Sequence, residues 1–298
     1  MSILAFLNMI FLKIAGFLLS IILIWTVQAP AGVTIAPREE QSLLLQASIL
    51  SDVHMQSFEY SGFQELSKTL LDIGASKVPQ DALVFVGDNT MNGQSFEYLM
   101  FYGLLSRYSK VDAKNTLVAM GNHDYAAPAS VQAAIDRHNF FLRSYNGALN
   151  EQAYYSREIN GCTFVVLAGD DPKSEYTLTA AQAAWLSETM AAAAPGKPVF
   201  VFCHYSLSSY DAGDAAILAV LAQYANVFLF NGHWHSPLSV WPSDGLTKVN
   251  LQGLHSHVSE EYAGEGVQLE VYADRVLLRG RNYMTGEWLE EFEVLLNV

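Results

Sequence analysis

Basic residues are scarce in this chain. It has 16 Lys and Arg side chains against 30 Asp and Glu, and its formal net charge at pH 7 is −14. A protein that binds nucleic-acid polymers needs a basic stripe, because cationic side chains must displace counterions from the phosphates. We therefore expect no nucleic-acid polymer as a partner. Small anionic substrates are not excluded, because bound divalent cations would reverse the sign of the local field.

Cysteine is scarcer still. The chain has only Cys162 and Cys203, and both lie within apolar, strand-like runs. The sequence does not require a disulfide, and we expect two buried free thiols. Internal repeats and low-complexity segments are also absent beyond the N-terminal region. At 298 residues we expect one large domain with a substantial core.

Acidic residues are missing from the N-terminal region, and none precedes Glu39. The stretch from Ile3 to Val27 is nearly all apolar. Its second half, Ile14 to Val27, has the length of the hydrophobic part of a secretory signal, and Val27-Gln28-Ala29 offers small residues where a signal peptidase reads. We expect residues 1–29 to be directed to a membrane.

Two interpretations of residues 1–29 stay open. A cleaved signal peptide is preferred, and the alternative is an uncleaved anchor that spans the bilayer if Lys13 extends to its surface. In either case Lys13, on the N-terminal side, predicts that the remaining chain is exported. The expected location is extracytoplasmic, either secreted or membrane-anchored with the folded domain outside. No protein partner is indicated.

After this leader, residues 30–42 are rich in Pro, Gly and charge and are predicted to form a linker, and residues 43–298 are predicted to form a single domain. Helical patterns recur between apolar runs. They cover Phe63 to Gly74, Phe96 to Ser109, Val131 to Phe141, Thr179 to Ala194 and Asp214 to Tyr224. Alternating strands and helices predict right-handed crossovers around a parallel or mixed sheet.

A second sheet is indicated by strand-like runs that have no helix between them. These runs are Tyr154 to Arg157, Cys162 to Leu167, Leu246 to Leu251, Val267 to Tyr272, Arg275 to Arg281 and Trp288 to Val294. Turn chemistry at Ala273-Asp274 and Thr285-Gly286 predicts antiparallel pairing near the C-terminus. The expected fold class is α/β, with two packed mixed β-sheets flanked by helices.

Five strand-like runs are each followed by side chains that bind metals. The runs are Ser48 to Leu50, Leu83 to Val86, Thr116 to Met120, Val199 to Phe202 and Val227 to Phe230. The blocks that follow them are Asp52-Val53-His54, Gly87-Asp88-Asn89, Gly121-Asn122-His123-Asp124, His204 and Gly232-His233-Trp234-His235. Because ligands bind outside the carboxyl ends of strands in open α/β sheets, these blocks are expected to converge on one site.

The residue types in these blocks favour a centre of two metal ions. The candidate ligands are Asp52, His54, Asp88, Asn122, His204, His233 and His235. Seven ligands are too many for one tetrahedral ion and enough for two if a carboxylate bridges. Mixed carboxylate and imidazole donors suit divalent Mn, Fe or Zn better than Mg or Ca. Two such ions serve the hydrolysis of a phosphate ester best.

The series D-x-H, G-D-x4-G, G-N-H-D, V-x-x-H and G-H-x-H resembles the calcineurin-like metallophosphoesterase family over roughly residues 46 to 236. The resemblance implies a four-layer αββα sandwich and divides the candidate ligands into two sets. It implies that Asp52, His54 and His235 bind the first metal, that Asn122, His204 and His233 bind the second, and that Asp88 bridges them.

The resemblance also implies roles for two residues that are not ligands. His123 corresponds to the family's histidine that stabilises the phosphoryl oxygens or protonates the leaving group, and Asp124 is expected to orient it. The implied nucleophile is a metal-bridging hydroxide. The purple acid phosphatase branch is disfavoured, because it has glycine and tyrosine where this chain has His54 and Met91.

The predicted function is therefore hydrolysis of a phosphomonoester or phosphodiester on a small phosphorylated substrate. The loops that follow the ligands are expected to determine which ester is cleaved. A non-enzymatic binding or scaffold module on the same fold is the alternative, and a metallohydrolase of a non-phosphorus bond is a second. Roles for His255, His257 and Tyr125 near the site stay open, whereas His138 is expected to be structural.

Overall fold

The computed structural model describes residues 27–57, 59–127, 130–169, 178–242, 245–255 and 263–298. The apolar stretch up to residue 26 and His257 lie outside these residues, so the predictions made for them stay predictions. Within the described residues, no helix combines the length and the apolarity needed to cross a bilayer.

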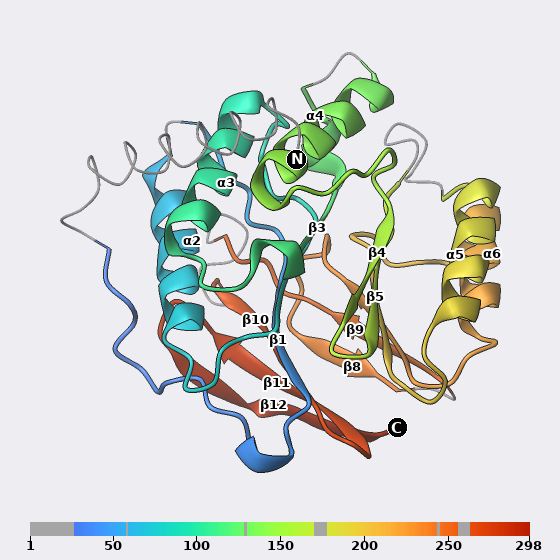
Figure 1. Cartoon of the computed structure of the whole chain (residues 1–298). Helices are drawn as coiled ribbons and strands as arrows, with labels where there is room; N and C mark the ends of the chain where they lie inside the picture. The colour runs from blue at the N-terminus through green and yellow to red at the C-terminus, as the bar shows by residue number, and fades with distance from the viewer. Residues whose placement is uncertain (1–26, 58, 128–129, 170–177, 243–244, 256–262) are drawn as a thin grey trace.

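The first of two six-stranded sheets has the order β12-β11-β10-β1-β2-β3 (Figure 1). Its strands are β1 (Leu45–Leu50), β2 (Ala82–Val86), β3 (Thr116–Ala119), β10 (Glu265–Val271), β11 (Arg275–Asn282) and β12 (Glu287–Asn297). β1, β2 and β3 are parallel, whereas β10 pairs antiparallel with β1 and continues into two antiparallel hairpins. The carboxyl ends of β1, β2 and β3 therefore meet at one edge.

The second sheet has the order β4-β5-β6-β7-β9-β8. Its strands are β4 (Tyr155–Ile159), β5 (Cys162–Val166), β6 (Val199–Phe202), β7 (Val227–Asn231), β8 (Ser239–Trp241) and β9 (Leu246–Asn250). β5, β6, β7 and β9 are parallel, and the two edge strands are antiparallel to their neighbours. β6 and β7 end side by side, as β1 and β2 do in the first sheet.

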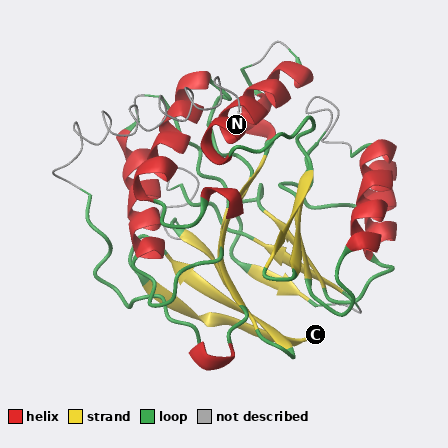
Figure 2. Cartoon of the chain, viewed as in Figure 1, coloured by secondary structure: helices red, strands yellow, loops and turns green. Residues whose placement is uncertain are grey.

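Helices cover the outer face of each sheet, which gives four layers (Figure 2). They are α2 (Tyr60–Gly74), α3 (Ser95–Tyr108), α4 (Val131–Asn146), α5 (Ala180–Ala192) and α6 (Ala212–Leu221), with short 3-10 turns at Glu40–Ser42, Ala113–Asn115 and Asn122–Tyr125. Leu66 and Phe101 of α2 and α3 pack against the first sheet. Leu186 and Ile217 of α5 and α6 pack against the second.

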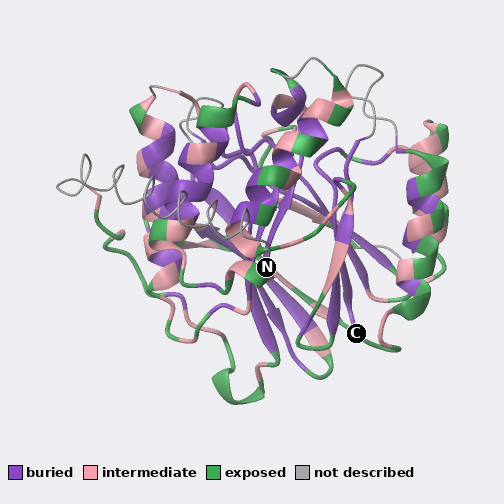
Figure 3. Ribbon diagram, turned by 45° about the horizontal axis from the view of Figure 1, so that its top comes forward, coloured by how far each residue is buried: buried purple, intermediate pink, exposed green. Residues whose placement is uncertain are grey.

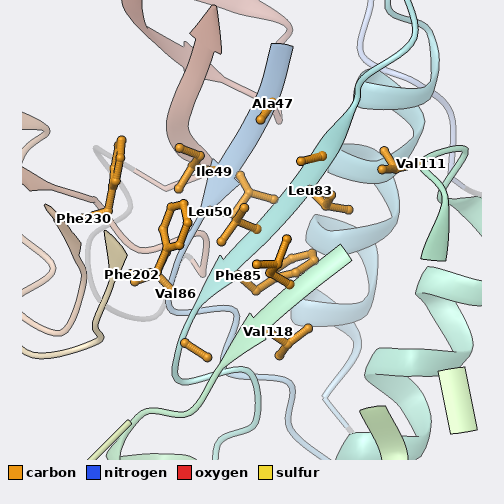
Figure 4. Close-up of a cluster of buried hydrophobic side chains, with 14 of the residues drawn as sticks. Ala47, Ile49, Leu50, Leu83, Phe85, Val86, Val111, Val118, Phe202 and Phe230 are labelled. Carbon is orange, nitrogen blue, oxygen red and sulfur yellow. The ribbon is translucent and has the colours of Figure 1, made fainter. Parts of the chain in front are cut away.

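Apolar side chains from both sheets fill the space between them (Figure 4). Ile49 of β1 lies on the side of Phe202 of β6, and both are fully buried. Val201, the residue before Phe202, packs instead with the helices on the outer face, because successive strand side chains point to opposite faces. Burial on both faces explains why the strands are continuous apolar runs, and Figure 3 shows them buried throughout the centre.

The predicted fold class is confirmed: two mixed sheets are packed together and flanked by helices. The five ligand-bearing runs all form strands, but they are divided between the sheets, with β1 to β3 in one and β6 and β7 in the other. The C-terminal strands pair antiparallel as predicted, yet they extend the first sheet. The short strand β8 was missed. Cys162 and Cys203 are buried free thiols, as expected.

Residues 33–39, within the predicted linker, pack against the first sheet as a strap. Ile35 is fully buried, and its carbonyl accepts a hydrogen bond from the Lys77 backbone. The Val33 amide donates a hydrogen bond to the Gly286 carbonyl, and the Val33 carbonyl accepts a hydrogen bond of 2.8 Å from the Arg281 guanidinium. The strap therefore leaves little free chain between residue 27 and the folded domain.

Candidate metal centre

The candidate site lies where the two sheets meet at the ends of their parallel strands. The sheets approach closely: the backbone carbonyl of Val86, at the end of β2, lies 2.8 Å from Nδ1 of His204, which follows β6. Gly232, after β7, lies so near β1 that an added Cβ would be 2.0 Å from the Ser51 hydroxyl. Glycine fits at this position because an added side chain would collide with Ser51 and with the carboxylate of Asp52.

The first group of ligand atoms comes from Asp52, His54 and His235. Oδ1 of Asp52 lies 2.8 Å from Nε2 of His235 and 3.7 Å from Nε2 of His54. The two imidazole Nε2 atoms are 3.2 Å apart. These three residues offer ligand atoms within 4.8 Å of one another, which is close enough to share one metal ion.

The second group comes from Asp88, His204 and His233, and again the ligand atoms lie within 4.8 Å of one another. Oδ2 of Asp88 is 3.2 Å from Nε2 of His204. The Asn122 side-chain oxygen lies 3.1 Å from Nδ1 of His233 and so joins this group. The structure thus brings together all seven residues that the sequence proposes as ligands.

Asp88 lies between the two groups. Its Oδ2 atom, 3.2 Å from His204, is also 3.9 Å from Nε2 of His54 in the first group. Its other oxygen, Oδ1, accepts a hydrogen bond of 2.8 Å from the backbone amide of His123. One oxygen of Asp88 therefore faces both groups while the other is held by the protein.

Five of the candidate ligands have a left-handed backbone, which non-glycine residues seldom adopt. The residues and their φ angles are Asp52 (54°), His54 (46°), Asp88 (48°), His233 (74°) and His235 (48°). Among the described residues, only Asn160 and Asn226 are further non-glycine residues with positive φ. Backbone of this kind concentrates at functional sites, where the surrounding fold holds it in place. Sequence patterns gave no sign of it, since no ligand is a glycine.

His123 and Asp124 lie in the 3-10 turn after β3, and they have separate partners. Nδ1 of His123 is 2.7 Å from the backbone carbonyl of Met91, so in the neutral ring Nδ1 carries the proton and Nε2 does not. The ring of His123 is 4.7 Å from the ring of His54, measured between centroids. Met91, rather than Asp124, is the described hydrogen-bond partner of the imidazole.

Asp124 joins the loop after β2 to the loop after β3. It is fully buried, and its two oxygens accept hydrogen bonds from the backbone amides of Asn89, Thr90 and Gly121 and from the Thr90 hydroxyl. Burial and then the charge of Asp88 raise the pKa of Asp124, whereas these donors lower it. Asp124 thus positions the loops that carry Asp88 and His123.

The electrostatics of the cluster stabilise charge on its buried groups. Burial alone would raise the pKa of Asp52, but His204 and hydrogen bonds from His235 and His54 hold it well below the ordinary value. Burial would lower the pKa of His204, but Asp88 and Asp52 raise it to about 9. In the protein without metal, the positive charge of the His204 imidazolium therefore offsets part of the negative charge of Asp52 and Asp88.

Several features of the donor set fit metal ions. Nδ1 of His204 donates to the Val86 carbonyl, so that Nε2, beside Asp88, is the nitrogen that would bind a metal once it gives up its proton. That Nε2 atom is buried and has no hydrogen-bond partner among the described residues. Fixing one imidazole nitrogen on a carbonyl so that the other can bind is the usual arrangement around protein metals. The combined nitrogen and oxygen donors suit Mn, Fe or Zn.

Other candidate residues have different surroundings. His255 is buried behind the first group, with its ring 6.4 Å from that of His54 and its Nε2 3.8 Å from Glu59 and 3.9 Å from Glu65. Sequence spacing alone did not associate these glutamates with the site. His138 is fully buried on α4 beside Tyr98, as expected for a structural residue. The Tyr125 hydroxyl donates to the Gly169 carbonyl.

Known structures share this fold. GAP50, the anchor in the inner membrane complex of Plasmodium, aligns with a TM-score of 0.53 at 12% identity, covering 85% of this chain and 89% of GAP50. A 5'-nucleotidase from Candida albicans aligns with a TM-score of 0.50 at 12% identity, covering 91% of this chain but 52% of the nucleotidase. This chain thus corresponds to about half of that enzyme. No curated protein sequence matches it.

The sequence profile of the calcineurin-like phosphoesterases matches residues 48–237, which is most of the chain and includes every strand end that carries a candidate ligand. The match begins within β1 and ends just after His235, the last candidate ligand. The profile and the four-layer fold agree, and the chain belongs to the calcineurin-like phosphoesterase family.

Proposed function

We propose that this protein is an exported phosphoesterase that depends on two divalent transition-metal ions and hydrolyses a phosphomonoester or phosphodiester. The observation that carries the proposal is the placement of Asp88, whose Oδ2 atom faces His54 of one ligand group and His204 of the other. A carboxylate shared between two imidazole-rich groups is better suited to two ions that it bridges than to two ions bound at separate sites.

The proposed ligands of the first ion are Asp52, His54 and His235, and those of the second are Asn122, His204 and His233, with Asp88 shared. When bound, such ions activate water as a nucleophile and neutralise charge on the phosphoryl oxygens. Two of these ligands are oriented by hydrogen bonds to the backbone: the Val86 carbonyl orients the ring of His204, and the His123 amide orients the carboxylate of Asp88. Held ligands reduce the reorganisation that catalysis requires.

His123 is proposed to assist the leaving group. Its Nδ1–H is held by the Met91 carbonyl, and its ring lies edge-on to that of His54. Protonated at Nε2, the imidazole would donate to a phosphoryl oxygen or to the departing alkoxide. Asp124 is proposed to act through the loops it joins.

The fold alone does not separate an enzyme from a binding module, because GAP50, an anchor, shares it. The side chains favour the enzyme. A module that only binds a partner has no need of a complete set of ligands, four of them buried and five on left-handed backbone, together with a histidine held beside them.

Purified protein lacking residues 1–29 is assayed with aryl phosphate monoesters and diesters, with and without added Mn²⁺. We expect cleavage that depends on metal and is lost in Asp88→Asn, because the bridging position loses its charge. Asp136→Asn, an exposed aspartate on α4, is the matched control. Absence of cleavage of every phosphate ester by metal-loaded protein, together with retention of a specific partner, would establish the binding module instead.

Export is proposed from the apolar N-terminal stretch and Lys13. If that stretch is retained as an anchor, only a few residues separate the bilayer from the folded domain, because the Val33 amide donates a hydrogen bond to Gly286, between β11 and β12 of the first sheet. Fractionation of cells that express the full chain, with N-terminal sequencing of the product, separates cleavage near Ala29 from an anchor.

A further inference from the structure

Trp234 is an exposed indole placed between two candidate metal ligands. It separates His233 from His235 in the turn after β7, and 65% of its surface is exposed. Exposure of so large an apolar side chain forgoes the free energy that its burial would release. The sequence identifies the flanking histidines but assigns nothing to the residue between them.

The backbone around Trp234 is held in one shape. Its amide donates a hydrogen bond of 2.9 Å to the Gly232 carbonyl, and the histidines on both sides have left-handed φ angles of 74° and 48°. The Trp234 ring lies 5.3 Å from the His233 ring in an edge contact, and Tyr205 makes a similar contact with His233 at 5.4 Å. The turn is therefore held by its backbone, and the indole lies against His233 of the second ligand group.

The opposite side of the centre has a different character. Behind the first ligand group, His255 lies 3.8 Å from Glu59 and 3.9 Å from Glu65. The site is thus aromatic near His233 and acidic near His54. An organic group that carries a second negative charge is disfavoured by these carboxylates, whereas an uncharged ring is accommodated by the indole.

Exposed aromatic side chains occur on several segments that follow the ligand-bearing strands. The described residues with large, exposed aromatic side chains are Tyr60, Phe96, Phe140, Tyr210, Trp234 and Trp241. Tyr60, Phe96 and Tyr210 follow β1, β2 and β6, on the segments that begin at the ligand-bearing ends of those strands. Trp234 is in ring contact with the candidate ligand His233, so it offers an apolar surface beside the second ligand group.

We infer that Trp234 determines substrate specificity by stacking on an uncharged planar ring in the organic group of the phosphate ester. The inference rests on the proposed function and adds the substrate class: aryl or heteroaryl phosphate esters that carry a single phosphoryl group. A planar ring pairs with an aromatic side chain in offset or edge geometry, and this adds affinity beyond the buried area.

The test compares 2-naphthyl phosphate with phenyl phosphate, whose leaving groups are similar in acidity and differ by one fused ring. The ratio of the two kcat/KM values is measured for the wild type, Trp234→Ala, Trp234→Phe and Trp241→Ala. Trp241 is a matched control, since it is 55% exposed but lies on the edge strand β8. We expect Trp234→Ala to reduce the preference for the naphthyl ester about 3- to 10-fold, chiefly through KM.

Trp234→Phe is expected to retain part of the preference, and Trp241→Ala all of it. A purely structural role for Trp234 would instead lower activity on both esters equally, together with metal content, and an unchanged ratio in Trp234→Ala overturns the inference. Calorimetric binding of 2-naphthylphosphonate and phenylphosphonate gives the same ratio without turnover. Failure of the wild type to cleave any ester would therefore refute the proposed function, while the phosphonate ratio would still decide the role of Trp234.

Discussion

At the scale of single residues, the left-handed backbone of the candidate ligands accounts for much of the site's geometry. Such a conformation costs a non-glycine residue on the order of 1–3 kcal/mol. Asp52 and His54 both adopt it, so they can direct their side chains to one point although only one residue separates them. Residue types and spacing identified these ligands, but the backbone that aims them depends on contacts with distant segments, such as the hydrogen bond from the Asp52 amide to the Gly87 carbonyl, and is not encoded locally.

His123→Ala is expected to retain the metal ions and to lose turnover. Because the lost group acts as a proton donor, kcat should fall about 10²- to 10⁴-fold for alkyl esters and much less for nitrophenyl esters, which leave without a proton. Metal analysis and kinetics with both kinds of ester check this prediction. Loss of metal from the variant would contradict the role, since His123 would then be a ligand.

The carboxyl group of Glu265 is expected to make stability depend on pH. Burial, and then the neighbouring Glu291, raise the pKa of Glu265 to about 7 in the folded protein. The folded state therefore binds a proton that the unfolded state releases near pH 4.5, so this group's contribution to stability is complete below that pH and is lost as pH rises through about 7.

Glu265→Gln should remove that loss and raise the free energy of unfolding at pH 8 by roughly 1–2 kcal/mol, less than the full shift because solvent screens the group in part. Urea denaturation at pH 5 and pH 8 measures it. Glu290→Gln, an exposed change on β12, should leave the pH dependence as in the wild type. Equal pH dependence in wild type and Glu265→Gln would show that Glu265 titrates normally.

At the scale of elements, the strap is attached by a buried arginine. Arg281 of β11 is fully buried and makes two hydrogen bonds, of 2.6 and 2.7 Å, to the carboxylate of Asp72 on α2. It also donates to the Val33 carbonyl and lies 4.8 Å from the Trp288 ring. One guanidinium thus joins the strap, the first sheet and its covering helix.

Arg281→Met is expected to lower the free energy of unfolding by about 3–5 kcal/mol, because it leaves the Asp72 carboxylate buried without its cation. Urea denaturation gives the value. Arg275→Gln removes an arginine of the same strand whose ion pairs lie at the surface, and it should lower the free energy of unfolding far less, because solvent screens surface pairs. Similar losses in the two variants would mean that Arg281 contributes no more than a surface charge.

The elements themselves were well predicted, because apolar runs and helical periodicity are local properties. β6 forms over Val199–Phe202 as expected, and α2 and α3 differ from prediction by a few residues at their ends. The allocation of strands to sheets was not predictable in this way. β9 and β10 are adjacent along the chain yet lie in different sheets, because pairing depends on distant partners such as β7 and β1.

The strap illustrates the same limit. Its Pro, Gly and charged residues are typical of a linker, and nothing local shows that Ile35 would be buried or that Arg281, far along the chain, would donate a hydrogen bond to the Val33 carbonyl. The candidate ligands were predictable because each lies just after the end of a strand. Their supporting contacts, such as the Met91 carbonyl with His123, depend on backbone atoms that every residue type carries.

At the scale of the whole molecule, the centre joins the two sheets. Asp52, His54, Asp88 and Asn122 follow strands of the first sheet, whereas His204, His233 and His235 follow strands of the second. Ions bound to both sets therefore link the two halves of the sandwich. Binding to the folded state alone stabilises it by mass action, by about 2.7 kcal/mol per site at a free metal concentration 100 times Kd.

Removal of metal with a chelator is accordingly expected to lower the Tm by several degrees, and Mn²⁺ should restore it. Calorimetry of the chelated and reconstituted protein makes the comparison. Asp88→Asn should show a much smaller difference between the two states, because both ions lose a shared ligand. An identical Tm with and without metal would indicate that the two sheets are not linked in this way.

The central claim is that five strand ends assemble one dinuclear phosphoesterase centre. Its most direct test is a titration of chelated protein with Mn²⁺ in which hydrolysis of an aryl phosphate ester and bound metal are measured on the same samples. The account predicts activity that rises to a limit at about two ions per chain and is absent from Asp88→Asn. Full activity at one ion per chain, or activity that survives complete removal of metal, would contradict it.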